Sequence, residues 1–106
     1  MPELHIKNLK CVKKQDTVGK DSAILRVNGA TVSGPHLLGK GDDVTLNTLR
    51  TFTSSISVTL IEEDAGADDD LGTVTITDSQ AGIGTLTAFF NARTHADYHM
   101  TYDVHS

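Results

Sequence analysis

The sequence is short of several residue types and patterns that mark common protein classes. Its 106 residues include no tryptophan, two prolines and one cysteine. A lone cysteine excludes an internal disulfide and lacks the Cys/His spacing of a zinc site, so we predict that Cys11 is a small core residue. No apolar run approaches the roughly 20 residues that a membrane-spanning helix needs. A chain of this length buries a sizeable core without disulfide bonds, so we expect one domain over residues 1–106.

Basic residues are also scarce. The chain has 9 Lys and Arg residues against 14 Asp and Glu residues, which gives a net charge of −5 with His neutral. This balance disfavours nucleic acid as a partner, because phosphate backbones are bound by basic surfaces. The N-terminus, Met-Pro-Glu-Leu-His, lacks the basic-then-apolar pattern of a secretion signal. We therefore expect a cytosolic chain or export without a cleaved signal, and an excised domain of a larger protein is the alternative.

The pattern that the chain does contain is short apolar–polar alternation. Helical spacing of apolar residues is nearly absent, whereas Thr, Val and Gly are frequent. Asn28-Gly29 is a strong signal for a tight hairpin. We predict an all-β fold, a single antiparallel Greek-key β-sandwich of seven to eight strands. The expected strands cover residues 3–13, 22–28, 30–33, 42–49, 55–62, 72–78, 84–91 and 97–104.

The same alternation predicts which side chains face the core. Near Lys7-Asn8 the apolar positions change phase, which indicates a β-bulge in the first strand. The predicted core residues are Leu4, Ile6, Leu9, Cys11, Ile56, Val58, Leu60, Val74, Ile76, Tyr98, Met100, Tyr102 and Val104. We assign these positions to packing.

A strongly acidic segment joins two of the expected strands. Six carboxylates fall within the nine positions from Glu62 to Asp70. Carboxylates crowded in this way repel one another unless a cation lies between them. Oxygen ligands on a short loop are what Ca²⁺ prefers, so the segment favours a calcium site, with a solvated, highly charged turn as the alternative.

A second acidic loop precedes the second expected strand. Asp16 and Asp21 bracket a glycine there, between two strand segments. In a Greek-key sandwich the loop over residues 15–21 and the loop over residues 62–72 can lie at one end. Ligands from two directions are what a cation with six to eight oxygens needs.

The two loops together resemble those of C2 domains, the calcium-dependent membrane-binding modules. That family carries an aspartate pair around a glycine in its first top loop, and Asp16 and Asp21 match this pair with one residue fewer between them. Its third top loop reads Asp-x-Asp, a spacer, then an aspartate three residues before a glycine. Glu62 and Asp64 match the first part, with Glu in place of one Asp, and Asp69 matches the last aspartate. The Asp-Asp-x-Leu-Gly segment is also similar to small bacterial sandwich domains.

The resemblance implies a non-catalytic calcium-binding module. Its ligands for one or two Ca²⁺ ions are Asp16, Asp21, Glu62, Asp64 and Asp69, with Asp70 or Asp68 as substitutes. The chain also lacks a Gly-x-Ser-x-Gly elbow or a comparable nucleophile, so we expect no enzymatic activity.

Membrane docking, which the resemblance also implies, has weaker support in these loops. Docking members of the family place basic or bulky apolar residues there, whereas here the tip of the third loop is Ala65-Gly66-Ala67. Val18 and Lys20 are the expected weak membrane contacts. Calcium-dependent phospholipid binding therefore stays an alternative, as does a metal-free structural module that binds an unidentified protein.

One further cluster lies near the C-terminus. His95, Asp97 and His99 stand at i, i+2 and i+4, so in a strand they share one face. Such a trio suits Zn²⁺ or Ni²⁺. We favour the alternative, a solvated strand face, because His95 falls in the preceding turn.

Overall fold

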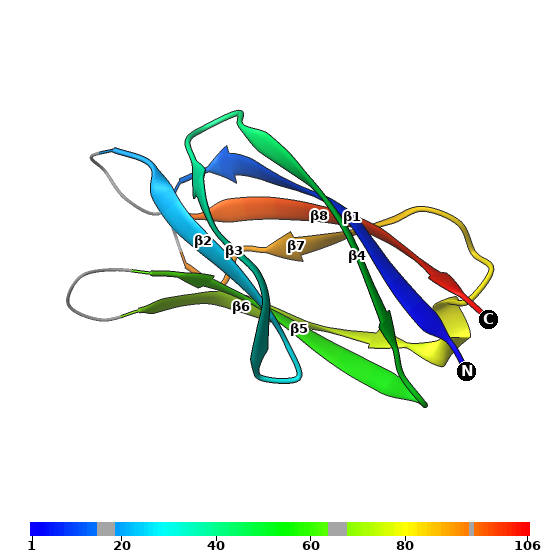
Figure 1. Ribbon diagram of the computed structural model, residues 1–106. Helices are drawn as coiled ribbons and strands as arrows, with labels where there is room; N and C mark the ends of the chain where they lie inside the picture. Colours follow the sequence, from blue (N-terminus) through cyan, green and yellow to red (C-terminus); the bar gives the residue numbers. More distant parts are fainter. Residues whose placement is uncertain (15–18, 64–67, 94) are drawn as a thin grey trace.

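The computed structural model describes residues 1–14, 19–63, 68–93 and 95–106 of the chain. The described elements are β1 (Glu3–Lys13), β2 (Asp21–Val27), β3 (Ala30–Leu38), β4 (Asp43–Thr51), β5 (Ser55–Glu62), β6 (Asp69–Thr77), the 3₁₀ turn η1 (Asp78–Gln80), β7 (Leu86–Phe90) and β8 (Asp97–His105). The strands form two four-stranded antiparallel sheets, β4-β1-β8-β7 and β3-β2-β5-β6 (Figure 1). The predicted all-β sandwich is confirmed. None of the described helical segments is long and apolar enough to span a membrane.

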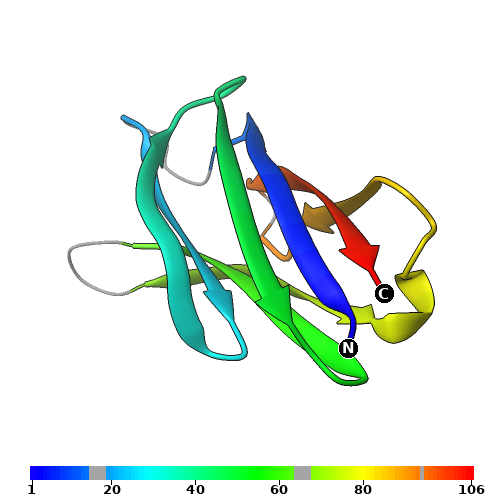
Figure 2. The same ribbon diagram turned by 45° about the vertical axis from the view of Figure 1, so that its right-hand side comes forward.

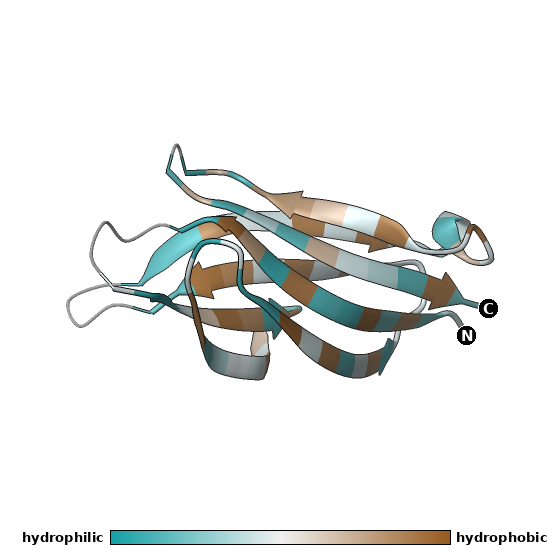
Figure 3. Cartoon of the chain, turned by 90° about the horizontal axis from the view of Figure 1, so that it is seen from above, coloured by the Kyte–Doolittle hydropathy of each residue, from teal (hydrophilic) through white to brown (hydrophobic). Residues whose placement is uncertain are grey.

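The core lies between the two sheets. Hydrophobic and hydrophilic residues alternate along the strands, so each strand turns one face to the interior (Figure 3). The predicted core residues are buried, apart from Val74, which is half-buried against the core. Cys11 is a fully buried free thiol, as expected. Burial raises its pKa, although the neighbouring Tyr98 hydroxyl acts the other way, so the thiol stays protonated.

Two local predictions are also confirmed. The register of β1 against β4 and β8 shifts between Ile6 and Asn8, which is the expected bulge. Asn28 and Gly29 have φ values of 49° and 85°, and Val27 pairs with Ala30 across them. Positive φ at both central residues is the geometry of a tight hairpin turn.

Two strands differ from the prediction by three residues or more at one end, and the other ends agree within two residues. The third strand does not stop at residue 33 but continues through Gly34-Pro35 to Leu38. It is an edge strand, so a proline without an N–H group costs it no ladder hydrogen bond. Gly34 suits the site because a Cβ there would lie 2.5 Å from the Ala23 carbonyl oxygen. The sixth strand begins at Asp69, inside the segment expected to be a loop.

The two ends of the elongated sandwich, which measures 42 × 24 × 22 Å, differ in what they carry. Both chain termini lie at one end, where β1 begins and β8 finishes (Figure 2). At the opposite end β2, β6 and β8 begin and β5 finishes. We call this second end the acidic end, after its described carboxylates, which include Asp21, Glu62, Glu63, Asp68, Asp69 and Asp70.

Candidate functional site

Two carboxylates of the acidic end face the core on neighbouring strands. Glu62 pairs with Ala23 across β5 and β2, and Asp21 stands two positions further along the same face of β2. The main-chain N–H of Glu63 donates to the Ser22 carbonyl at 2.8 Å, which holds the two strand ends together. Both Asp21 and Glu62 are fully buried. Diagonal positions of this kind place side chains within reach of one another.

Asp21 is held from the other sheet by a tyrosine. The Tyr98 hydroxyl on β8 donates a hydrogen bond to Asp21 Oδ2 at 2.6 Å. Burial, together with this carboxylate, raises the pKa of Tyr98, so the phenol keeps its proton and acts as the donor. The bond crosses the sandwich and fixes the orientation of the carboxylate. The sequence predicts only a packing role for Tyr98.

Asp69 completes the row of acidic residues across the strands. It pairs directly with Glu62, so its side chain lies on the same face of the sheet. Its Oδ1 lies 3.7 Å from Arg93 Nη2, on the connection between β7 and β8. Arg93 Nε also donates to the Asp70 carbonyl at 3.1 Å. This arginine is a contact that the sequence pattern did not indicate.

Asp70 and Asp68 have different surroundings. Asp70 is exposed and pairs with Ile61, so it alternates away from the face that carries Asp69. Its Oδ1 accepts a hydrogen bond from the Gly72 N–H at 2.8 Å. Asp68 Oδ2 lies 3.8 Å from Arg26 Nη2. Neither residue therefore joins the row of Asp21, Glu62 and Asp69.

Three of the predicted site residues, Asp16, Asp64 and Val18, lie outside the described residues. The predicted membrane contact Lys20 is described, and its Nζ lies 3.3 Å from Asp42 Oδ2. The Gly39 N–H donates to the same oxygen at 2.9 Å. This hydrogen bond, and then Lys20, lowers the pKa of Asp42.

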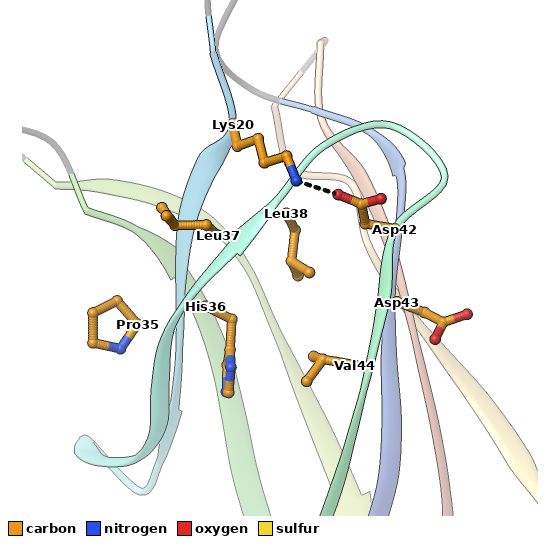
Figure 4. Close-up of a pocket in the computed structure, with 8 residues that line it drawn as sticks. All are labelled: Lys20, Pro35, His36, Leu37, Leu38, Asp42, Asp43 and Val44. Atoms are coloured by element: carbon orange, nitrogen blue, oxygen red, sulfur yellow. Dashed lines mark ion pairs between the residues drawn. The ribbon is translucent and has the colours of Figure 1, made fainter.

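Lys20 and Asp42 stand at one end of an open groove of about 530 Å³ between β3 and β4 (Figure 4). These two strands are edge strands, one from each sheet, so the groove runs along an open side of the sandwich. Its other lining residues are Pro35, His36, Leu37, Leu38, Asp43 and Val44. Its polar groups do not converge as in a ligand pocket, and we assign no ligand to it.

Among the described residues, one group of His, Cys, Asp and Glu side chains stands close enough to hold a metal ion. It is His5, Asp103 and His105, away from the acidic end. The expected trio near the C-terminus is not such a group. His99 Nε2 lies 3.3 Å from Asp97 Oδ1, but His95 is exposed in the turn before β8. This arrangement agrees with the solvated face that the sequence favoured.

The fold as a whole is similar to solved C2 domains. One C2 domain aligns over 100% of both chains, with a TM-score of 0.65 and 13% sequence identity. The calcium-bound pair of C2 domains from Extended-Synaptotagmin 2 aligns with a TM-score of 0.59 and 15% identity, over 97% of this chain and 44% of that one. Human GIVD cytosolic phospholipase A2 aligns with a TM-score of 0.60 and 13% identity, over 98% of this chain and 16% of the phospholipase.

These comparisons give the chain the fold of a C2 domain. No protein-family model and no curated protein matches the sequence. At such low identity the likeness concerns the fold alone. Because the alignment covers so small a part of the phospholipase, it carries no lipase activity over to this chain.

Proposed function

We propose that this chain is a non-catalytic calcium-binding module that holds one or two Ca²⁺ ions at the acidic end. The main support is the row of three carboxylates on adjacent strands, in which Asp21 and Glu62 are fully buried and Asp69 lies opposite Glu62. Neighbouring carboxylates disfavour one another's charge, and a divalent cation between them reverses the sign of that interaction. The ligand atoms of these three described residues do not all lie within 4.8 Å of one another, so a bound ion would have to draw the side chains together.

The chemistry of these ligands suits calcium. All are hard oxygen donors, and three bidentate carboxylates supply at most six of the six to eight oxygens that Ca²⁺ takes. Asp16 and Asp64, which the sequence resemblance implies as ligands, would add to them, together with main-chain carbonyls and water. Tyr98 supports these ligands without binding the ion, because its hydrogen bond orients the Asp21 carboxylate.

Arg93 would compete with calcium for the Asp69 carboxylate. Its guanidinium lies 3.7 Å from Asp69 Oδ1, where it supplies positive charge in the absence of metal. A calcium ion bound to Asp69 therefore replaces the Arg93 guanidinium as its positive partner. An exposed pair of this kind stabilises a protein by about 1 kcal/mol at most, so the exchange does not prevent binding.

The likeness of fold adds a second line of support. The Extended-Synaptotagmin 2 domains that align over 97% of this chain were solved with calcium bound. The same sandwich therefore accommodates calcium in another protein. In this chain the order of the two acidic loops matches the pattern of that family.

The test is thermal unfolding of the full chain with calcium and with chelator. We expect calcium to raise the free energy of unfolding by about 2.7 kcal/mol at a hundredfold excess over its dissociation constant. Asp69→Asn should reduce this calcium-dependent gain. Asp70→Asn removes the same charge from the opposite face of β6 and should leave the gain largely intact. Equal melting temperatures across millimolar calcium would contradict the proposal.

The metal-free alternative makes the opposite prediction. If the acidic end only keeps the chain soluble or repels wrong partners, the double variant Asp64→Asn with Asp69→Asn relieves like-charge repulsion. Its stability then rises slightly in any buffer. Under the calcium proposal, the same variant loses stability in calcium-containing buffer.

Calcium-dependent docking on an anionic membrane is the further alternative. Basic residues contribute roughly 1 kcal/mol each at such a surface, and Lys20 already pairs with Asp42. We therefore rank docking below calcium binding alone. Co-sedimentation with phosphatidylserine vesicles, with and without calcium, measures it. Calcium-dependent pelleting that Asp69→Asn abolishes would reverse this ranking.

A further inference from the structure

The end of the sandwich that carries both termini holds a second group of ligating side chains. His5 lies on β1, and Asp103 and His105 lie on β8, the neighbouring strand. His5 pairs directly with Asp103 across the two strands. The residues beside them in sequence, Leu4, Ile6, Tyr102 and Val104, are buried, so all three ligating side chains project from the outer face of the sheet. We call this group the histidine cluster.

The distances within the histidine cluster suit a small cation. Asp103 Oδ1 lies 2.9 Å from His105 Nε2 and 3.7 Å from His5 Nδ1, and the three ligand atoms all lie within 4.8 Å of one another. Ligands of a tetrahedral zinc ion, at about 2.0–2.1 Å from the metal, stand roughly 3.3 Å apart. The two distances to Asp103 bracket this value, so small rotations of the imidazoles close the site.

The burial and hydrogen bonding of the Asp103 carboxylate also favour a bound cation. Its Oδ1 is shielded from solvent, yet it accepts no hydrogen bond of good geometry from the described residues, although two imidazole nitrogens lie within 3.7 Å of it. Its Oδ2 lies 3.0 Å from Lys7 Nζ, which holds the carboxylate in place. Such an oxygen, close to two ring nitrogens, is available to a metal ion. Asp97 Oδ1 is in the same state beside His99, but only one imidazole lies near it among the described residues.

The surroundings of His5 also fit ligation through Nδ1. Its other ring nitrogen, Nε2, lies 3.4 Å from the Asn47 amide oxygen on β4. Metal-bound histidines usually donate their second N–H to such an acceptor, which fixes the tautomer and the ring orientation. His105 is 60% exposed, so a cation reaches the site from solvent.

We propose that His5, Asp103 and His105 form a binding site for Zn²⁺, with water in the fourth position. The ligand set of two imidazoles and one carboxylate is typical of zinc and unlike the all-oxygen shell of calcium. Binding would tie the first strand to the last near both termini. Lys7 holds the same carboxylate from its other oxygen and keeps one positive charge beside the ion.

The test is a titration of the metal-free full chain with zinc chloride, followed by calorimetry and by NMR of the imidazole nitrogens. We expect one zinc per chain and shifts of His5 Nδ1 and His105 Nε2. The double variant His5→Ala with His105→Gln should lose at least tenfold in zinc affinity. Both side chains project from the outer face of the sheet, so we expect the variant to fold, and its melting temperature in chelator checks this.

His99→Ala is the matched control. His99 lies on the same face of β8 and also faces an aspartate, Asp97, but without a third ligand among the described residues. Zinc affinity should be unchanged in this variant. Equal zinc binding by the double variant, or zinc binding that only Asp69→Asn removes, would overturn the proposal. Absence of zinc binding at millimolar concentration would show that the histidine cluster is an ion-pair network only.

Discussion

The acidic end and the histidine cluster arrange charged side chains in contrasting ways. At the acidic end, Asp21 and Glu62 point between the sheets and are fully buried. In the histidine cluster, His5, Asp103 and His105 stand on the outer face of one sheet and are partly exposed. The first arrangement places carboxylates within the packed core. The second leaves the described core beneath it without a charged side chain. A cation should therefore change the stability of the fold more at the acidic end than at the histidine cluster.

Apolar packing should be equally important at the two ends, and this is the largest effect we expect. Leu71 is fully buried near the acidic end, and Leu4 is fully buried beneath the histidine cluster. Leu71→Ala and Leu4→Ala should each lower the free energy of unfolding by about 2–5 kcal/mol. Chemical denaturation in chelator measures both. A clearly smaller cost for Leu71→Ala would show that the core near the acidic end is already loose without metal.

The buried hydrogen bond of Tyr98 should have the next largest effect, and only at the acidic end. Tyr98→Phe keeps the ring and removes the donor to Asp21 Oδ2. Hydrogen bonds to charged groups contribute about 1.5–3 kcal/mol, so we expect a loss of that size in the free energy of unfolding. Calcium affinity should fall as well, because the carboxylate loses its fixed orientation. Tyr102→Phe is the control, since its hydroxyl donates to the half-buried Gln80 instead.

A smaller effect is expected from the exposed carboxylate of Asp42. Its pKa is lowered by the Gly39 N–H and by Lys20. A lowered pKa in the folded state adds stability above the unfolded pKa, which is lost as the pH falls through the folded value. Wild type should therefore exceed Asp42→Asn in stability at neutral pH, and the gap should close on acidification below about pH 4. Unfolding curves of both proteins across this range check the sign.

The smallest expected effect is the coupling between the two proposed metal sites. They lie at opposite ends of a molecule 42 Å long and share no side chain. The effects of two such independent sites on the free energy of unfolding add within about 0.3–0.5 kcal/mol. The stabilisation by calcium should thus be the same with and without zinc, as thermal unfolding in the four metal combinations will show. A larger coupling would mean that β8, which carries both Tyr98 and Asp103, transmits strain along its length.

Strand alternation was sufficient to predict the class of fold and most of the core. The bulge near Asn8 and the Asn28-Gly29 hairpin were also readable, because each depends on the residues next to it. Alternation reports which face of a strand is apolar, and this signal needs no knowledge of the partner strand. It does not report where an edge strand stops, which is why the continuation of β3 through Pro35 was missed.

The candidate site was only partly predictable for a related reason. The concentration of acidic residues pointed to the segment from Glu62 to Asp70, and the resemblance to the loops of C2 domains pointed to Glu62, Asp69 and Asp21 in particular. The concentration of acidic residues by itself did not distinguish Asp69 from Asp70, since the face of each depends on where β6 begins. It also did not reveal that Arg93 lies against Asp69, because the two residues belong to different strand connections.

The sequence by itself therefore determined the sandwich and the acidic character of one end, through patterns that are local along the chain. The tertiary structure decided which distant side chains meet. Tyr98 reaches Asp21 because the two sheets face each other, and His5 meets Asp103 because the first and last strands are neighbours. Strand order follows from packing the whole chain at once, so no local pattern contains these pairs.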